Sequence, residues 1–463
     1  MIRVFNLYVS AKSLLLMMLE SFLIVASLIG GAKLRFWSDP DSFEFYLNSP
    51  SFLLQVLTVL LVFETCCYYN ELYDLNVVRV RGQHLVRLAQ ALGAGCILLG
   101  VLYYFLPWLL LGRGVLIIAV GLVAGSTFGV RAGLDRIWAS TVRENNVLIL
   151  GNGELALSVA REFERRADLS FRVVGFLARE STVTELFGRP VFAGELSAVA
   201  RDQRVSRIVV ALADQRGALP TRDLVRLKVQ GVEIEDAHSA LAGLTGRVWL
   251  RAVRPSWFVF SGGFRRSGTT LLLKRALDLA LSLVGVILFS PVIALIAVAV
   301  WFDSRGPALY RQARVGLGGR VFNVVKFRSM RIDAEAKSGA QWALKDDLRI
   351  TRVGRFLRKY RLDELPQFFN VIRGEMSFVG PRPERPCFVE QLREQIPFYD
   401  ERHSVRPGIT GWAQVEFTYG ASVEDALRKL EYDLFYLKNM SILFDIAIVF
   451  RTARIVLFGV GSR

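Results

Sequence analysis

Residues 276–302 read ALDLALSLVGVILFSPVIALIAVAVWF, an apolar run longer than the roughly 20 residues that cross a bilayer. Basic side chains flank this run on both sides: Arg265, Arg266, Lys274, Arg275, Arg305, Arg311, Arg314 and Arg320. A complete crossing would carry the second basic group to the outer face, against the positive-inside rule. Ser290-Pro291 lies in the middle of the run, where proline breaks a helix and the Ser290 hydroxyl can bond the freed backbone. We therefore predict a re-entrant helix over 274–302 that bends at Ser290-Pro291 and returns to the same face, in preference to a spanning helix.

The N-terminal third contains four further apolar segments, at 12–32, 51–70, 88–111 and 113–130, each near the length of a membrane span. Basic residues lie before the first segment, between the second and third, and after the fourth: Arg3, Lys12, Arg79, Arg81, Arg87, Arg131, Arg136 and Arg143. We expect four transmembrane helices in residues 1–135, with the N-terminus and everything after Arg131 in the cytoplasm. Glu20 and Glu64 fall inside these segments, where they either pair between helices or line a functional cavity; pairing is the favoured alternative.

The composition agrees with a membrane protein and narrows the choice of partners. Hydrophobic residues make up 52% of the 463 residues and the mean hydropathy is +0.36, which is too apolar for an ordinary soluble protein of this length. The formal net charge of +16 indicates anionic lipid headgroups, phosphorylated substrates or nucleic acid, and positive-inside loops supply part of it. The four cysteines and three histidines form no pattern typical of a disulfide framework or a metal site.

Residues 144–260 have the pattern of a Rossmann-like α/β domain. The stretch NNVLILGNGELALSVAREFERR combines an apolar strand, a Gly-rich turn and an amphipathic helix, and further strand and helix patterns alternate after it. Gly151 and Gly153 match G-x-G-x-x-A, so this turn can hold a phosphate at the helix N-terminus. No acid ends the second strand-like run, FRVVGFL, where dinucleotide-binding domains hold a ribose, and such a turn also serves close packing of helix and strand. A bound nucleotide here is therefore the less favoured alternative.

A linker, 261–273, leads to a C-terminal domain over 274–463 that we expect to be mainly helical α+β. The run LYRQARVGLGGRVFNVVKFRSM predicts a β-hairpin, and helical stretches follow around 351–372 and 422–440. The last segment, 441–460, is apolar on most of its circumference with a few charged interruptions. We expect it to be an interfacial helix that lies on the same leaflet as the re-entrant helix.

The stretch RLDELPQFFNVIRGEMSFVGPRP, at 361–383, places two adjacent acids ahead of a Pro-Arg-Pro turn. Asp363 and Glu364 have an ordinary explanation, because acids are favoured at a helix N-terminus. The cations around them form either a basic face against anionic lipid or a phosphate site: Lys326, Arg328, Arg349, Arg352, Arg355, Arg358, Arg361 and Arg382. Arg382 has a constrained backbone between two prolines, which suits a preorganised contact with a phosphate. Since consecutive helical residues point in different directions, one acid can attack or bind metal while the other orients the site or takes a proton.

The chain resembles the bacterial sugar transferase family in several motifs that recur in the same order along the sequence. They are KRALD at 274–278, the Ser290-Pro291 break, KFRSM at 326–330, the stretch 361–383 and VRPGITGWAQV at 405–415. Members of this family are polyprenyl-phosphate hexose-1-phosphate transferases that start exopolysaccharide and O-antigen synthesis. The N-terminal helices and the α/β domain resemble its long form, and a weaker likeness is to the subgroup linked to exosortase-associated polysaccharide loci. The resemblance implies a multidomain membrane protein with a four-helix transmembrane bundle, a Rossmann-like α/β domain and a catalytic domain that contains the re-entrant helix.

The resemblance also implies a mechanism for the acidic pair. Asp363 matches the family's nucleophile, which attacks the β-phosphate of a UDP-sugar, releases UMP and forms a covalent phosphosugar–Asp. Undecaprenyl phosphate then takes the sugar phosphate from this intermediate. Glu364 would orient the site or assist proton transfer, and Mg²⁺ would bridge Asp363 and the diphosphate.

The phosphate-binding arginines of the family match Arg358 and Arg382, and Lys326 and Arg328 are further candidates. Glu375 stands where many relatives have Asp in a G-D-M-S turn, which weakens a metal role for this position. The implied partners are a UDP-sugar, undecaprenyl phosphate, membrane lipids and a second copy of the chain in a homodimer, with no nucleic acid. The implied location is the bacterial inner membrane, with several passes and the catalytic domain on the cytoplasmic face.

Two other functions fit part of the pattern. A membrane-tethered nucleotide-sugar epimerase or dehydratase would use the α/β domain, but the Tyr-x-x-x-Lys match, Tyr8 to Lys12, lies ahead of the first membrane segment. A non-catalytic scaffold of polysaccharide machinery would explain the charge, but not the acidic pair and the Pro-Arg-Pro turn together. The sugar that is transferred stays open, as does the choice between nucleotide binding, dimerisation and regulation for the α/β domain.

Overall fold

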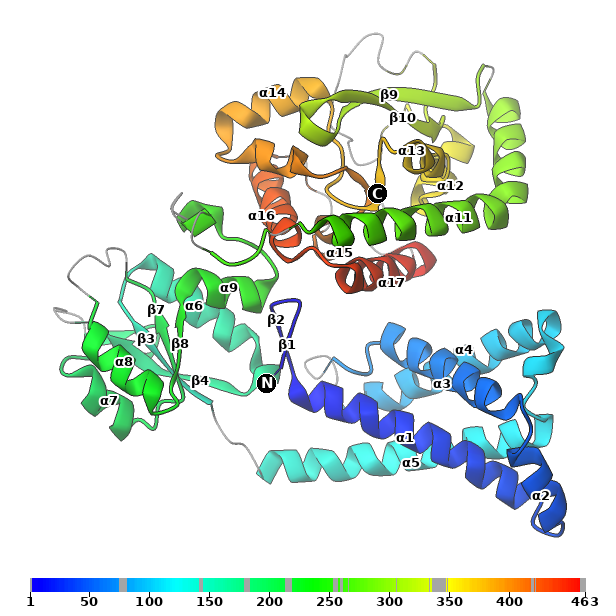
Figure 1. The fold of residues 1–463 in the computed structure, drawn as a ribbon, viewed down its shortest axis with the longest axis horizontal. Helices are drawn as coiled ribbons and strands as arrows, with labels where there is room; N and C mark the ends of the chain where they lie inside the picture. Colours follow the sequence, from blue (N-terminus) through cyan, green and yellow to red (C-terminus); the bar gives the residue numbers. More distant parts are fainter. Residues whose placement is uncertain are drawn as a thin grey trace. The chain divides into compact units, whose positions relative to one another are not determined.

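A computed structural model gives the fold of the chain (Figure 1). It describes residues 2–74, 81–140, 145–178, 184–212, 219–252, 257–258, 261–264, 266–304, 306–332, 334, 347, 349–417, 420 and 422–458. These residues form two compact units, Met1–Ala237 and His238–Arg463. Some residues used for the topology and the last predicted helix lie outside the described part: Arg79, Arg143, Arg265, Arg305 and 459–460.

The four apolar segments of the N-terminal third are helical, as predicted. They form α1 (Ala11–Arg35), α3 (Phe52–Tyr69), α4 (Arg81–Phe105) and α5 (Arg113–Ser140), with the short α2 (Pro40–Leu47) after α1. Helix α1 packs against α5 and α3, and α3 packs against α4. One buried apolar cluster takes side chains from all four long helices, among them Leu28, Val59, Leu99 and Ala119. Together with α11 (Gly268–Asp303), the described residues contain five helices long and apolar enough to cross a membrane.

The two acids inside these helices are buried and paired. Arg131 of α5 donates to both carboxylate oxygens of Glu20 on α1, at 2.6 and 2.9 Å. Glu64 of α3 accepts from Ser21 at 2.6 Å and from Tyr73 at 2.7 Å. The structure therefore supports the pairing alternative, in which these acids join α1 to α3 and α5.

The α/β part of the first unit contains a mixed sheet of six strands in the order β5-β6-β4-β3-β7-β8. The strands are β3 (Asn145–Leu150), β4 (Phe171–Leu177), β5 (Glu185–Leu186), β6 (Arg189–Phe192), β7 (Arg207–Val210) and β8 (Glu233–Asp236); the helices are α6 (Glu154–Arg165), α7 (Leu196–Asp202) and α8 (Thr221–Val229). All neighbouring strands are parallel except β5 and β6. The strand order reverses around β3, as it does in doubly wound folds, which agrees with the predicted alternation of strand and helix.

The Gly-rich turn of this sheet is closely packed. Gly151 follows β3 with a φ of 121°, and a Cβ at this position would lie 2.7 Å from the carbonyl oxygen of Ala211. Both observations require glycine for packing, independently of any ligand. Nucleotide binding at Gly151 and Gly153 therefore stays a prediction.

An N-terminal hairpin, β1 (Ile2–Val4) and β2 (Leu7–Val9), contacts the edge of the same sheet. Arg207 of β7 donates to the Tyr8 hydroxyl at 2.6 Å and to Glu235 of β8 at 2.9 Å. Arg3 donates to Glu235 at 2.8 Å. The hairpin thus attaches the start of α1 to the α/β sheet through a network of charged side chains.

The second unit begins at His238, earlier than the predicted domain boundary at 260. Helix α9 (Ala237–Thr245) is followed by residues that pack on α16 (Val423–Asn439). The buried carboxylate of Glu431 on α16 accepts from Arg247 and from the backbone N–H of Leu250, both at 3.0 Å. Because an acid buried in this way needs these partners, the segment through Leu250 is part of the second unit.

Helix α11 begins at Gly268, inside the segment predicted to be a linker, 261–273. Ser267 caps the helix, since its hydroxyl accepts from the backbone N–H of Thr270 at 3.1 Å. The predicted start at 274 is therefore six residues too late, because hydrophobicity alone does not reveal the cap.

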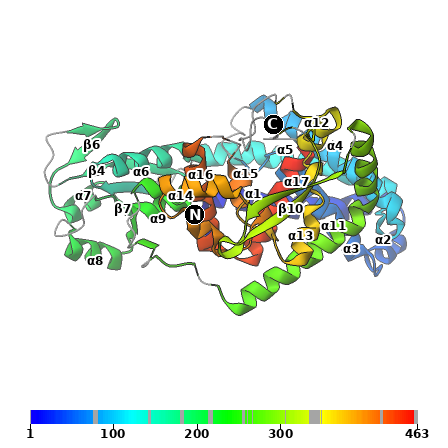
Figure 2. The same cartoon turned by 90° about the horizontal axis from the view of Figure 1, so that it is seen from above.

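Helix α11 continues through the predicted break, with Pro291 inside it. The helix changes direction sharply along its length, in both Figure 1 and Figure 2. Pro291 has no N–H for the carbonyl of Ile287, and the Ser290 hydroxyl donates to that carbonyl at 2.9 Å. The bond predicted from the Ser290 hydroxyl to the freed backbone is thus confirmed.

The rest of the second unit is mainly helical around two small sheets. Its elements are β9 (Leu309–Val315), β10 (Val321–Phe327), α12 (Arg352–Lys359), α13 (Gln367–Arg373), β11 (Ser377–Val379), α14 (Pro386–Gln395), β12 (Gly408–Thr410), α15 (Trp412–Glu416), α16 and α17 (Ile442–Phe458). The antiparallel pair β9–β10 is the predicted hairpin, and β11 pairs with β12 in parallel. Two buried charges fix α11 to this core. Asp278 accepts from the hydroxyl of Ser377 and the N–H of Phe378, both at 2.9 Å, and Lys274 donates to Asp445 at 2.7 Å.

Candidate active site

The acidic pair lies on a single 3₁₀ turn, Leu362–Glu364, between α12 and α13. Arg361, just before the turn, has a φ of 55°, and Pro366 follows it, so the helix predicted across 351–372 is interrupted here. Asp363 keeps 9% of its surface exposed and its neighbour 8%. Both acids are therefore held in the interior of the second unit, not at a solvated helix start.

Glu364 is bound by two cations that approach the same oxygen. Arg382 donates to its Oε1 at 2.5 Å, and the Lys326 ammonium lies 3.4 Å from that atom. Burial acts to raise the pKa of Glu364, but Arg382 and Lys326 outweigh it and hold the pKa well below its ordinary range. Glu364 is thus ionised at neutral pH and already occupied by protein partners.

Asp363 differs from its neighbour because, among the described residues, its carboxylate makes no hydrogen bond or ion pair. Burial and the adjacent Glu364 raise its pKa above the ordinary value, while Lys326, Arg358 and Arg382 act in the opposite direction. The two carboxylates therefore have different environments, while the different roles predicted for them stay a prediction. One is fixed by cations, and the other is available to a ligand.

Asn370 of α13 holds the strand that carries Lys326. Its fully buried side chain accepts from the backbone N–H of Val325 at 3.0 Å and donates to the carbonyl of Asn323 at 2.8 Å and to Glu375 at 2.7 Å. Sequence analysis missed this residue, although an amide in the middle of the apolar run FFNVI is a signal for it.

The other two predicted phosphate ligands lie in different places. Arg358, near the end of α12, donates to the hydroxyl of Ser329 at 3.0 Å, and its charge acts on Asp363. Arg328 instead donates to the carbonyl of Ser304, just after α11, at 2.5 Å. The structure therefore brings Arg358 to the acidic pair and holds the Arg328 guanidinium against backbone.

The Pro-Arg-Pro turn is held by two arginines that the sequence analysis did not assign to the site. Arg402 donates to the carbonyl of Arg382 at 2.9 Å and forms a buried ion pair with Asp433 at 2.9 Å. Arg314 of β9 donates to the carbonyl of Pro383 at 3.0 Å. No local motif marks these residues, because each acts on backbone that is distant in sequence.

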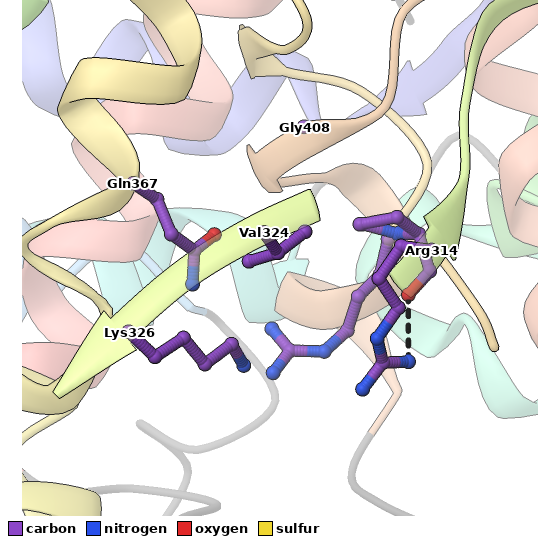
Figure 3. Close-up of a pocket in the computed structure, with 7 residues that line it drawn as sticks. Arg314, Val324, Lys326, Gln367 and Gly408 are labelled. Atoms are coloured by element: carbon purple, nitrogen blue, oxygen red, sulfur yellow. Dashed lines mark hydrogen bonds between the residues drawn. The ribbon is translucent and has the colours of Figure 1, made fainter. Parts of the chain in front are cut away.

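A small pocket opens beside Glu364. Figure 3 shows Lys326 extending into it from β10 and Gln367 from α13, with Arg314 across from them. Its lining residues are Arg314, Val324, Lys326, Gln367, Arg382, Pro383 and Gly408. Three of these seven residues are cationic, so the pocket favours an anionic ligand.

The remaining predicted residues are not part of this pocket. Ser290 and Pro291 lie in α11 of the same unit, and Gly151 and Gly153 lie in the other unit. In the part of the chain that the structure describes, no three His, Cys, Asp or Glu side chains are grouped to hold a metal ion. A carboxylate without protein partners, such as Asp363, nevertheless fits Mg²⁺, which proteins commonly bind through one or two carboxylates and substrate phosphates.

A buried acidic pair next to a pocket lined by three cations, on a unit with a long apolar helix, is typical of a membrane protein that acts on an anionic ligand. Residues 269–459 match the family model described as bacterial sugar transferase. The chain is 33% identical over 321 residues to the UDP-glucose:undecaprenyl-phosphate glucose-1-phosphate transferase of Klebsiella pneumoniae, with 67% of each chain covered. The chain belongs to the bacterial sugar transferase family, which confirms the resemblance to that family. The likeness to the exosortase-associated subgroup stays a prediction.

Two further relatives match well over shorter shares of their length. The UDP-N-acetylgalactosamine-undecaprenyl-phosphate N-acetylgalactosaminephosphotransferase of Aeromonas hydrophila is 43% identical over 242 residues, 52% of this chain and 56% of the relative. The undecaprenyl-phosphate glucose phosphotransferase of Komagataeibacter xylinus is 35% identical over 329 residues, 66% of this chain and 58% of the relative. The chain thus spans little more than half the length of these two relatives.

Proposed function

We propose that the chain transfers a hexose-1-phosphate from a UDP-sugar to undecaprenyl phosphate through a covalent intermediate on Asp363, as a first step of exopolysaccharide synthesis. The observation that carries this proposal is the contrast within the acidic pair. Glu364 is occupied by Lys326 and Arg382, whereas the buried Asp363 carboxylate has no partner in the described part of the chain. The printed names of the relatives support the donor and acceptor classes.

The reaction consists of two displacements at one phosphorus. An oxygen of Asp363 attacks the phosphorus that bears the sugar, the bond from that phosphorus to the bridging oxygen breaks, and UMP leaves with the electron pair. A phosphate oxygen of the acceptor then attacks the same phosphorus, and the carboxylate of Asp363 leaves. Arg382, Lys326 and Arg358 supply positive charge around the transferred phosphoryl group.

The role of Glu364 follows from its environment. Because its pKa lies well below the ordinary range, it is a poor proton acceptor at neutral pH. Of the two roles predicted from the sequence, we therefore propose orientation, in which Glu364 holds Arg382 and Lys326 toward the pocket. Mg²⁺ held by Asp363 and the diphosphate would add charge neutralisation at the same place.

We further propose that the four N-terminal helices cross the inner membrane as a bundle and that α11 enters and leaves on the cytoplasmic face. The positive flanks, the proline inside α11 and the sharp change of direction of this helix support this path. Cys387, an exposed thiol on α14, is a natural reporter. In intact spheroplasts a membrane-impermeant maleimide should leave Cys387 unlabelled until the cells are permeabilised, with Cys387→Ser as the control. Labelling from outside would contradict the re-entrant path.

The homodimer is a separate proposal, with the α/β domain as a candidate for its contact. Multi-angle light scattering of the purified protein should give twice the mass of the 52.0 kDa chain after the detergent is subtracted. A monomeric mass at micromolar concentration would contradict it.

The reaction is tested by measuring UMP release from UDP-sugars with undecaprenyl phosphate and Mg²⁺. Asp363→Asn should reduce release to background, whereas the matched change Glu394→Gln, on the exposed surface of α14, should leave it unchanged. Without acceptor, the intact mass of the wild type should increase by one hexose phosphate, and that of Asp363→Asn should not. Full turnover by Asp363→Asn would falsify the covalent mechanism.

The same assay separates the alternatives. An epimerase or dehydratase would alter the UDP-sugar without releasing UMP, and a scaffold would do neither. A comparison of UDP-glucose, UDP-galactose and their N-acetyl forms identifies the sugar.

A further inference from the structure

Gln367, the first residue of α13, carries a polar group that the proposed reaction has not used. Its side chain is almost fully buried, with 3% of the residue exposed, and its amide nitrogen has no hydrogen-bond partner among the described residues. Burying an amide without a partner is unfavourable, and the great majority of buried polar side chains in proteins are paired. An unpaired amide beside a pocket therefore points to a ligand.

The amide and the cations of the site share one pocket. Figure 3 shows the ends of Gln367 and Lys326 on the same side of it. Lys326 and Arg382 line the pocket and both bind Oε1 of Glu364, so the pocket lies directly beside this carboxylate. A pocket that combines a neutral N–H donor with cations suits a ligand with an anionic oxygen better than it suits a cationic or an apolar ligand.

We propose that Gln367 is a ligand-binding residue whose amide N–H donates to a phosphoryl oxygen in this pocket. The proposal rests on the proposed function, which supplies two sources of such an oxygen: the diphosphate of the nucleotide sugar and the phosphate of the polyprenyl acceptor. Gln367 of α13 then completes a set of donors with Lys326 of β10, Arg382 of the Pro-Arg-Pro turn and Arg314 of β9.

Gln367→Met tests the proposal because methionine keeps the length and volume of glutamine but has no amide. Loss of a hydrogen bond to a charged group lowers affinity roughly 10- to 100-fold. If the phosphoryl group belongs to the donor, we expect this loss of affinity for UDP and inorganic pyrophosphate, measured by calorimetry on the full-length protein. If it belongs to the acceptor, we expect an equal rise in the KM for undecaprenyl phosphate. The melting temperature should stay the same or rise, because the substitution removes an unpaired buried donor. Gln367→Glu should bind still more weakly, since it adds a negative charge.

The same two substitutions at Gln391, on the exposed surface of α14, provide the matched control and should change neither binding nor melting temperature. If Gln367→Met binds UDP and pyrophosphate more weakly, Gln367 binds a phosphoryl group of the nucleotide sugar. If only the KM for undecaprenyl phosphate changes, Gln367 binds the phosphate of the lipid acceptor. Unchanged values for all three ligands in Gln367→Met would overturn the proposal, as would a lower melting temperature with unchanged binding, which indicates a structural amide. A wild type that binds pyrophosphate through Gln367 but never releases UMP would contradict the proposed function alone.

Discussion

The hydroxyl of Ser290 donates to the carbonyl of Ile287, at 2.9 Å, in place of the N–H that Pro291 lacks. Ser290→Ala should therefore leave this carbonyl unsatisfied in an apolar helix. We expect a loss of about 1 kcal/mol in the free energy of unfolding, which lowers the melting temperature by roughly 2–4 °C. Differential scanning fluorimetry in a mild detergent measures the shift.

Ser282 provides a control on the same helix. It is buried, and its hydroxyl has no hydrogen-bond partner among the described residues, so Ser282→Ala should not lower stability. When Pro291→Ala is introduced first, an N–H returns to the Ile287 carbonyl, and adding Ser290→Ala should then have almost no effect. An equal loss in both backgrounds would show that the hydroxyl does not replace the missing N–H.

The acidic pair should respond to neutralisation in opposite directions. A carboxyl group whose pKa is raised in the folded state binds more protons there than in the unfolded chain, so stability falls as the pH rises through that interval. The raised pKa of Asp363 therefore lowers stability at neutral pH, and Asp363→Asn should raise the melting temperature while it abolishes activity. The pKa of Glu364 is lowered, so its contribution is present at pH 7 and lost at acid pH, and Glu364→Gln should lower the melting temperature. Shifts of the same sign would contradict the assigned environments.

Glu364→Gln should also move the pH dependence of kcat/KM. The negative charge of Glu364 raises the pKa of Asp363, so its removal should shift the acid limb to lower pH. Burial lowers the pKa of Lys326 and Glu364 opposes that effect, so in the variant Lys326 should lose its proton at lower pH, which shifts the alkaline limb as well. Both limbs are thus expected to move in the same direction, measured as UMP release between pH 5 and pH 10. An unchanged alkaline limb would mean that Lys326 need not be protonated.

Asn370 should act on the site through the strand it holds. Asn370→Ala leaves the N–H of Val325 and the carbonyl of Asn323 without their partner, and we expect a loss of about 2–4 kcal/mol in the free energy of unfolding. Because Lys326 is next to Val325, the KM for the UDP-sugar should rise even at temperatures where the variant is folded. A KM equal to that of the wild type would restrict Asn370 to a structural role.

The long apolar helices and the bend of α11 were predictable because hydrophobicity over 20 residues and a central proline are local signals. The acidic pair and Arg382 lie within one stretch of 23 residues, 361–383, and family resemblance carried over their roles. The interruption at Arg361 was not predictable, because a left-handed arginine has no sequence signature and is stabilised by its surroundings.

Other parts of the site depend on contacts between residues far apart in the chain. Arg402 fixes the carbonyl of Arg382 from 20 positions away, and Asp433 neutralises Arg402 from a different helix. Arg328 shows the converse, since it resembles a phosphate ligand in sequence but bonds the carbonyl of Ser304. A single sequence does not state which cation faces the ligand and which faces backbone.

The anchoring of Arg247 and Leu250 to Glu431 sets the limits of any shortened or recombinant form of the catalytic part. A fragment cut at the apparent Gly-rich linker, near Gly262, would leave the buried carboxylate of Glu431 without either partner. Such a fragment should express poorly, while one that starts at His238 keeps the contact intact. The unit that can be exchanged between chains therefore extends upstream of the glycines, to include the residues that bond the buried acid.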